Sequence, residues 1–561
     1  MSREIYYHAI AAEIPRLLGL LDRNAASASY GCFDRHYWNA LDTDFPCARC
    51  QEAVLTLALL YALKRDDNPY CGNGNILAWI DASLDFWCRI QERGGGFSEM
   101  YPHENAIVAT AFSSYAVSES LLVLGAGAVG RRARIIGALC RAGDWLMPRV
   151  DRVVVNQTAG AAIALHNIYA LTGEERYRAA ARDKIAAIGR AQDEEGWLPE
   201  DGGADIGYLS LAIDYLAKYY DKSRDGRALA ILTRAVSFIA PFIDARAPLG
   251  GSCGSRSTEY LIPSGFEILS PYCPKARAAA RAVRAAMRAG STVLPSSLDD
   301  RYLAYLGYTY LQAYLHATEG GEEQPHGATE GTVRYPRAGV TIIRNRDVHF
   351  AHNARKGGTF KAVFPNGRVV DDWGIVAISA DGTAYFSAWM NPPVSCGDPG
   401  GGDALASTVP FRRVTQRFPR PETYALFRLF LSTLGRSESV SGRFRAFLRK
   451  RLMSRDEPRS PFHLERRISF RREGMTVFDR ISGTRGIGRI IVGAKATFLY
   501  VLSAHYHLSP DLDRPVFSFD IGGGRGGDDG LRRRGELWTG RSRSWYPRST
   551  RRRASPCFTG G

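Results

Sequence analysis

The sequence pattern of the chain changes within residues 300–353, DRYLAYLGYTYLQAYLHATEGGEEQPHGATEGTVRYPRAGVTIIRNRDVHFAHN. In DRYLAYLGYTYLQAYLHA, apolar residues recur at three-and-four spacing, which is typical of a helix with a buried face. After the polar, Gly-rich joint at residues 318–331, GVTIIRNRDVHFAHN alternates apolar and polar residues, as a half-buried strand does. This stretch therefore predicts helices on its N-terminal side and strands on its C-terminal side.

Toward the N-terminus, the helical pattern continues back to about residue 50. Segments with apolar residues at helical spacing alternate with short loops that contain Gly, Pro and Asp. They include residues 53–65, 76–93, 106–125, 133–147, 159–173, 177–192, 207–223, 228–243 and 276–289. Helix pairs with short connections favour a toroid or solenoid over a single bundle. We therefore expect an α/α toroid, incomplete or of the (α/α)6 type, over residues 1–320.

Toward the C-terminus, residues 358–370, 373–389 and 462–483 show strand alternation, with Asn-Gly and Asp-Gly pairs where hairpins turn. We expect an antiparallel β-sandwich over residues 332–520. Between its strands, residues 422–434 and 442–453 have a helical pattern. The predicted fold class is thus α+β and multidomain, with the toroid first and the sandwich second.

The charge of the chain is strongly basic, with a formal net charge of +16 over 561 residues. Such a surface attracts polyanions, among which acidic polysaccharide, nucleic acid and anionic membrane are all admissible. Residues 521–561 hold ten Arg against three acidic residues. Interleaved Trp and Tyr in this tail would suit single-stranded nucleic acid. Because no folded nucleic-acid module accompanies it, we predict a disordered tail and no nucleic-acid partner.

Membrane, export and metal signals are weak in this sequence. The longest apolar runs fall short of the roughly 20 residues of a membrane span, and the N-terminus lacks the features of a secretory signal. We therefore expect no membrane span and, from the sequence alone, a cytoplasmic protein. Cys47 and Cys50 have metal-ligand spacing but no second pair, so neither a metal nor a cofactor is predicted. The sequence does not indicate an oligomeric state.

Polar and aromatic residues gather just before predicted helices, where helical toroids bind ligands. The first group, in GGGFSEMYPHENAIVATAF, contains Tyr101, His103 and Asn105. Asn105 fits a helix N-cap, but capping does not account for the neighbouring ring and imidazole. Substrate contact is therefore the alternative interpretation for all three residues.

Later helix starts carry further candidates. Asn156 and Gln157 are either caps or a pair of amides that could hold a carboxylate. Tyr208, in the first turn of a predicted helix, is either a core anchor or a proton-transferring phenol. Arg256 and Tyr260 lie in the polar loop GGSCGSRSTEYLIPSGFEIL. Arg256 there could pair with an acid of its own loop or with an anionic substrate group.

The stretch HNARKGGTFKAVFPNGRVVDDWG begins at His352, in the predicted sandwich. Together with the Tyr208 helix, GYLSLAIDYLAKYY, and the Asn156-Gln157 pair, it resembles the heparinase II/III-like polysaccharide lyases, most closely the heparinase III branch. The resemblance covers roughly residues 50–520. It implies an α/α toroid followed by an antiparallel β-sandwich, with the active site between them.

The resemblance also implies a chemistry, β-elimination at a uronic acid within an anionic polysaccharide. Tyr208 would transfer the proton, Asn156 and Gln157 would hold the uronate carboxylate, and His352 would orient or neutralise the sugar. His352 would then lie within about 10 Å of Tyr208 for both to contact one sugar ring. Gln157 stands where the family commonly has a histidine, which puts efficient chemistry in doubt. The family usually acts in the periplasm or cell envelope and needs no cofactor for these steps.

Two alternatives remain open. A glycoside hydrolase on the same toroid would need two opposed carboxylates, for which Glu200, Asp201 and Asp205 are candidates. A protein that binds or helps to process an exopolysaccharide without cleaving it would tolerate Gln157. A triterpene cyclase is disfavoured, because its QDEEGW-type repeat occurs once, at residues 192–197, and such proteins do not end in a β-sandwich.

Overall fold

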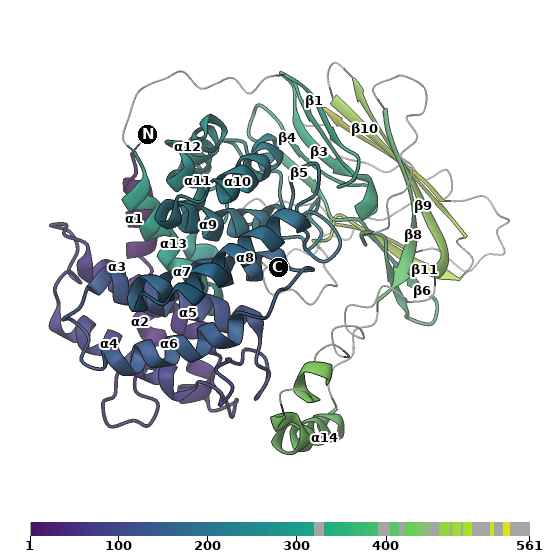
Figure 1. Ribbon diagram of the computed structural model, residues 1–561. Coiled ribbons are helices and arrows are strands. Elements are labelled where there is room, and N and C mark those ends of the chain that lie inside the picture. Colours follow the sequence, from purple (N-terminus) through teal and green to yellow (C-terminus); the bar gives the residue numbers. More distant parts are fainter. Residues whose placement is uncertain are drawn as a thin grey trace.

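The computed structural model describes residues 2–318, 330–390, 404–414, 420–437, 440–444, 447, 459–471, 474–483, 486–495, 506, 516–520 and 531–538. Helices form the N-terminal part of the molecule and antiparallel sheets the C-terminal part (Figure 1). The change of pattern at residues 318–331 thus separates the two kinds of structure. The predicted α+β fold class is confirmed.

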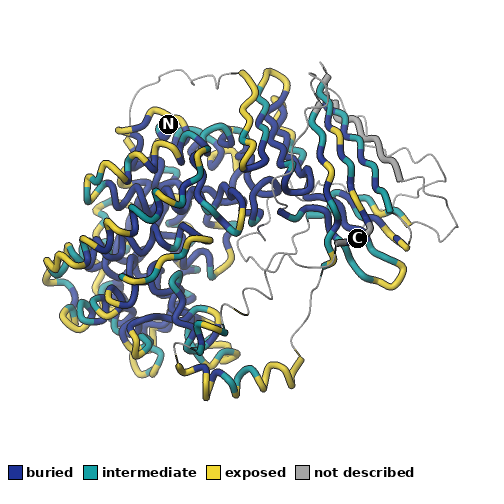
Figure 2. Tube along the Cα trace, turned by 45° about the vertical axis from the view of Figure 1, so that its right-hand side comes forward, coloured by how far each residue is buried: buried dark blue, intermediate teal, exposed yellow. Residues whose placement is uncertain are grey.

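The inner helices of the N-terminal part form a closed ring, in which each contacts the next and the last returns to the first. They are α3 (Ala53–Ala62), α5 (Ile107–Leu124), α7 (Val155–Thr172), α9 (Ile206–Ser223), α11 (Ser264–Leu269) and α13 (Asp300–His316). These helices are buried along most of their length (Figure 2). Because helices buried all round need no polar stripe, α3 reads as the nearly continuous apolar run AVLTLALL.

The outer helices pack against this ring and are amphipathic. They are α1 (Glu4–Ala11), α4 (Gly74–Arg89), α6 (Arg132–Leu146), α8 (Glu175–Ala191), α10 (Gly226–Ile239) and α12 (Pro274–Arg288), while the short α2 (Ile14–Leu20) contacts α13. In α10, for example, Ala228, Ile231, Leu232 and Ala235 are buried on one face. The α/α toroid prediction is confirmed, in its closed form.

Helix α5 is long and apolar enough to cross a membrane by length and composition, and in the part of the chain that the structure describes no other helix meets that test. Its apolar window is 67% buried inside the protein. It packs against α3, α6 and α7, which is the position of a core helix of the toroid.

The smaller sheet has the order β1-β2-β3-β4-β5. Its strands are β1 (Gly331–Tyr335), β2 (Val340–Arg344), β3 (His349–Asn353), β4 (Thr359–Val363) and β5 (Val369–Asp372), all paired antiparallel. The predicted Asn366-Gly367 turn connects β4 to β5, with Gly367 at a φ of 79°. That left-handed conformation suits glycine.

The larger sheet has the order β12-β11-β6-β7-β8-β9-β10-β13. Its strands are β6 (Ile375–Ser379), β7 (Ala384–Phe386), β8 (Ala404–Arg413), β9 (Arg459–Arg471), β10 (Gly474–Ser482), β11 (Ile487–Val492), β12 (Phe517–Asp520) and β13 (Leu531–Trp538). Strand β13 lies within the predicted disordered tail and pairs with β10. There the structure differs from the prediction, because an edge strand can pair through its backbone without an alternating sequence. The rest of the tail lies outside the described residues.

The smaller sheet lies between the toroid and the larger sheet (Figure 1). One of its faces joins the core of the toroid through residues such as Ala351 and Val363. The other face packs Phe350 and Phe360 against Ile468 and neighbouring residues of the larger sheet. The molecule is therefore layered, and the candidate site depends on which face of the smaller sheet each side chain occupies.

A helical excursion leaves the larger sheet after β8. Its helix α14 (Pro421–Ser432) confirms the helical pattern predicted at residues 422–434, while most of the second predicted helix lies outside the described residues. The segment returns to the toroid, where Arg428 forms an ion pair with Asp44. It therefore covers part of the toroid surface near Asp44, between α2 and α3, and near the loop between α4 and α5, where Ser441 Oγ donates to the carbonyl of His103.

Candidate functional site

A loop at residues 249–262 lies between the toroid and the smaller sheet, and we call it the rim loop. Asp205 anchors it from the toroid, since one carboxylate oxygen accepts from the backbone N–H of Arg256 at 3.0 Å and of Thr258 at 3.3 Å. The other oxygen caps α9 at the N–H of Tyr208, 3.1 Å away. One carboxylate thereby fixes the start of α9 against the rim loop. Because both of its oxygens are engaged, Asp205 is poorly placed to act as a hydrolytic carboxylate.

Four predicted site residues meet at this point. The Arg256 guanidinium lies 4.7 Å from the centroid of the Tyr208 ring, and its Nη1 donates to Glu200 Oε1 at 2.5 Å. Asn156 Nδ2 donates to the other oxygen, Glu200 Oε2, at 2.7 Å. The structure therefore brings together Asn156, Glu200, Arg256 and Tyr208, from residues 156 to 256 of the sequence. Arg256 Nε is buried and has no hydrogen-bond partner among the described residues, so one guanidinium donor remains unused.

Glu200 is an acidic residue of this cluster whose pKa is shifted. Burial raises the pKa of Glu200 to about 8, with Arg256 acting in the opposite direction. A carboxyl group with that pKa is largely protonated at neutral pH. Asp201 Oδ2 lies 3.4 Å from the same Arg256 Nη1. Glu200 and Asp201 thus sit on one side of a single guanidinium, and they do not face each other across a gap.

Tyr260, the next predicted site residue, belongs to a row of aromatic rings. Its ring lies 6.0 Å from that of Tyr208 and 6.2 Å from that of Tyr302. Tyr302 continues to Tyr305 at 5.6 Å, and Arg49 stacks over Tyr305 at 3.8 Å. Tyr260 is only 2% exposed, so its main contact is packing beneath Tyr208.

Tyr101, His103 and Asn105 form a second group, beside the α14 excursion. The Tyr101 ring packs against Phe427 at 5.7 Å. His103 Nδ1 lies 3.0 Å from Glu92 Oε2, and its carbonyl accepts from Ser441 Oγ at 2.7 Å. Asn105 Nδ2 donates to the carbonyl of His103. A substrate-contact role for these three residues stays a prediction.

The capping interpretations of Asn105 and Asn156 are wrong. Helix α5 has Ala106 at its N-cap and α7 has Val154, and neither helix has a side-chain capping bond. Asn156 lies one position inside α7, and its side-chain amide donates to Glu200 instead. Gln157, next to it, is half-buried. An asparagine before a helix predicts a cap only when the helix begins directly after it.

The prediction for His352 is corrected by the structure. Along β3, Ala351 faces the toroid core and Asn353 Nδ2 donates to the rim-loop carbonyl of Cys253 at 2.7 Å. Because successive strand residues point to opposite faces, His352 points the other way, with Phe350 and toward the larger sheet. It is 2% exposed, and burial together with Arg466 lowers its pKa to about 3. His352 is therefore a buried residue of the sandwich, on the far side of the sheet from Tyr208.

Asn353 and Lys356 are two β-domain residues that bind the rim loop, and the sequence interpretation missed them. Lys356 Nζ donates to the carbonyl of Gly254 and to Ser257 Oγ, on either side of Arg256. Burial lowers the pKa of this amine to about 8. Strand parity was the signal available, since Asn353 follows His352 directly and so occupies the opposite face.

Backbone strain occurs near Arg256 and Tyr208 and also in the loop that contains Tyr101. Asp201 and Ser257 have positive φ values of 48° and 60°, and His103 and Asn105 have values of 61° and 50°. Such values are uncommon for residues other than glycine and tend to cluster at functional sites. Within the described residues, no group of three His, Cys, Asp or Glu side chains could hold a metal ion. The chemistry available here is that of a phenol, a guanidinium, an amide and two carboxyl groups.

Neither protein-family models nor curated proteins give a match to this sequence. Solved structures with a similar fold include a Paenibacillus xanthan lyase (10% identity, TM-score 0.49, 86% of this chain and 46% of that one). They also include the Streptomyces coelicolor A3 chondroitin AC lyase (11%, 0.49, 87% and 68%) and heparinase III (9%, 0.44, 97% and 95%); unsaturated glucuronyl hydrolases match over the 56% of the chain that they cover. The chain spans less than half of the xanthan lyase. These similarities do not single out a heparinase III branch, and at such identities and TM-scores they establish no activity.

Proposed function

We propose that the chain is a polysaccharide lyase that cleaves a uronic-acid-containing anionic polysaccharide by β-elimination. Tyr208 transfers the proton in this proposal. Arg256, with Asn156 and Gln157, offsets the charge of the uronate carboxylate. The observation that carries the proposal is the contact of one guanidinium with both the Tyr208 ring and Glu200, which Asn156 also binds.

The chemistry explains why these groups belong together. The hydrogen on C5 of a uronic acid is acidic only because of the neighbouring carboxylate, whose negative charge opposes carbanion formation. A positive charge and amide donors beside that carboxylate lower the barrier. The Tyr208 hydroxyl, acting as a phenolate, takes the C5 proton. The C4–O4 bond then breaks, a C4=C5 double bond forms, and the same hydroxyl passes the proton to the leaving O4.

The protonation of Glu200 supports the same assignment. A largely neutral Glu200, with its pKa raised to about 8 by burial, leaves much of the Arg256 charge for a substrate carboxylate. Glu200 then positions Arg256 and Asn156, and it need not touch the sugar itself.

The test is incubation with a panel of uronate polymers, such as heparan sulfate and alginate, while the ultraviolet absorbance of the unsaturated product is followed. Tyr208→Phe keeps the ring contact with Arg256 and removes only the hydroxyl. We expect it to lower turnover by roughly 10²–10⁴-fold with polymer binding retained. The matched control is Tyr37→Phe, at a half-buried tyrosine whose ring contacts Phe86 away from the site.

Other outcomes would select the alternatives. Full activity in Tyr208→Phe would overturn the proton-transfer assignment. New reducing ends without the absorbance change would indicate a glycoside hydrolase, although Glu200 and Asp201 lie on the same side of Arg256 and Asp205 is engaged by the rim loop. Binding without cleavage of any polymer would indicate a protein that binds exopolysaccharide only.

A further inference from the structure

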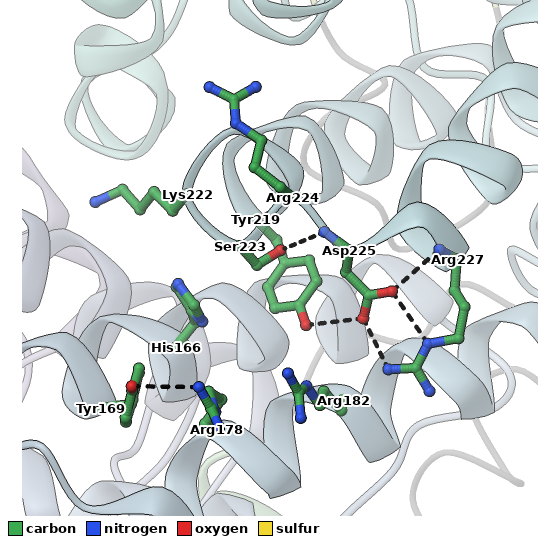
Figure 3. Close-up of a pocket in the computed structure, with 10 residues that line it drawn as sticks. All are labelled: His166, Tyr169, Arg178, Arg182, Tyr219, Lys222, Ser223, Arg224, Asp225 and Arg227. Atoms are coloured by element: carbon green, nitrogen blue, oxygen red, sulfur yellow. Dashed lines mark hydrogen bonds and ion pairs between the residues drawn. The ribbon is translucent and has the colours of Figure 1, made fainter.

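A cavity of about 570 Å³ opens at the opposite end of α7 and α9, where these helices finish (Figure 3). Along α9 it lies about 20 Å from Tyr208, at a rise of 1.5 Å per residue. Its lining includes Arg178, Arg182, Lys222, Arg224 and Arg227 against one carboxylate, Asp225. The volume falls within the range of about 300–1,000 Å³ for small-molecule sites. This cavity is separate from the candidate lyase site.

The basic side chains are only partly neutralised. Arg227 is held by Asp225 at 2.8 Å. The other pairs are with acids outside the lining: Lys222 with Glu119 at 2.6 Å, Arg178 with Glu175 at 2.8 Å and Arg224 with Asp221 at 3.0 Å. Arg182 is exposed and has no ion pair or hydrogen bond with any described residue. Exposed ion pairs are weak and exchange readily for a better anion. The pocket therefore has a local excess of guanidinium and ammonium donors.

A buried, unsatisfied imidazole lies at the same pocket. His166 is 8% exposed, and its Nδ1 is buried without a hydrogen-bond partner among the described residues. Burial, with Lys222, Arg178 and Arg182, lowers its pKa to about 4, so the ring is neutral at physiological pH. Neutral imidazole in a polar pocket calls for a ligand hydroxyl or oxyanion, since an unmade buried hydrogen bond is costly.

Two aromatic rings complete the lining. Tyr169 and Tyr219 lie 5.9 Å and 5.4 Å from the His166 ring, centroid to centroid. In Figure 3, Arg178 and Arg182 come from one helix and Lys222 from another, His166 lies between them, and Tyr169 lies beside Arg178. Arginine donors suit the oxygens of a phosphate or sulfate, and the rings offer apolar walls for a sugar.

We infer that this pocket binds a monosaccharide carrying a phosphate or sulfate ester. The ester oxygens bind Arg182 and Arg178, while His166 Nδ1 meets a hydroxyl or ester oxygen. The shared chemistry is a tetrahedral oxyanion on a sugar ring. The two sources, a phosphorylated metabolite and a sulfated polysaccharide unit, are distinguished by the experiment.

The experiment is titration calorimetry of the full chain with glucose 6-phosphate, glucose 6-sulfate, inorganic phosphate and uncharged glucose. We expect at least one ester to bind, glucose not to bind, and Arg182→Gln to weaken ester binding tenfold or more. Arg190→Gln is the matched control, because Arg190 is exposed on the same helix but does not line the pocket. His166→Phe, which keeps an aromatic ring and removes Nδ1, should also weaken binding.

The proposal is overturned if neither ester binds at millimolar concentration, if glucose binds as well as its esters, or if Arg182→Gln binds like the unaltered chain. Tighter binding of the phosphate ester would identify a metabolite site, and tighter binding of the sulfate ester a polysaccharide subsite. Failure of lyase activity leaves this result unaffected, since the readout is binding alone.

Discussion

The two faces of the smaller sheet, β1–β5, carry polar residues with different tasks. On the face toward the toroid, Asn353 binds the rim loop, and Lys356, three residues on, holds the segment whose Arg256 lies over Tyr208. On the opposite face, His352 lies in the sandwich near the buried Arg466. The neighbouring residues His352 and Asn353 of β3 thus differ in their tasks. Asn353 supports the candidate site, and His352 belongs to the interior of the sandwich.

The sandwich face should be broken most severely by Arg466→Leu. The Arg466 side chain is fully buried, and its nitrogens lie 2.7 Å from Asp372 Oδ1 and 2.7 Å from Asp479 Oδ1. Its removal leaves two buried carboxylates without their cation, which costs about 3–5 kcal/mol. Urea unfolding measures the loss. Arg489→Leu, at an exposed pair with Asp520, is the control, and we expect it to cost less than about 1 kcal/mol; equal losses would contradict the contrast.

The toroid side should lose stability as the pH rises, through Glu200. Its pKa rises from 4.5 to about 8 on folding, so the native state binds more protons than the unfolded state between these pH values. The free energy of unfolding should therefore fall as the pH rises through this range, by about 1.4 kcal/mol per pH unit, and level off above it. Glu200→Gln removes this titration. If unfolding of the unaltered chain and of Glu200→Gln shows the same pH dependence, Glu200 titrates normally.

Lys356→Met tests whether the β domain positions the site. The variant keeps the length of the side chain and removes the donor to Gly254 O and Ser257 Oγ. Two buried acceptors lose their partner, which should cost about 1–3 kcal/mol. Polymer binding should weaken more in Lys356→Met than in the matched variant Lys361→Met, whose side chain lies 3.9 Å from Asp371. Equal effects of the two variants would show that the rim loop holds Arg256 without Lys356.

Much of the architecture could be predicted because it follows from periodicity. Inner helices are apolar all round, outer helices are amphipathic, and the change at residues 318–331 divides helices from strands. The β13 strand could not be predicted, because an edge strand paired through its backbone requires no apolar alternation. Helix starts were similarly uncertain, which is why capping stood as one of two interpretations for Asn105 and Asn156 until the structure excluded it.

The candidate site was predictable only in part. Asn156, Tyr208, Arg256 and Tyr260 share one cluster, but the sequence gives no indication that Glu200 would bind both Asn156 and Arg256. Contacts between residues so distant in the sequence depend on how the helices close into a ring. The sequence interpretation placed His352 in the site, whereas its neighbour Asn353 faces the toroid. Strand alternation assigns the two residues to opposite faces, but it does not say which face meets the toroid.

The smallest effect should come from His352→Phe. Phe350 and Phe360 already share this face with His352, and His352 Nε2 is buried without a hydrogen-bond partner among the described residues. Replacing that unsatisfied group with an apolar ring of similar size should change stability at neutral pH by less than about 1 kcal/mol. The pKa of His352 is lowered from 6.5 to about 3 on folding, so its stabilising contribution is present above pH 6.5 and is lost as the pH falls toward 3. His352→Phe should therefore resist acid unfolding better than the unaltered chain, and its activity on any polymer that is cleaved should stay within about twofold. A large loss of turnover with unchanged stability would return His352 to the active site and contradict the orientation of β3.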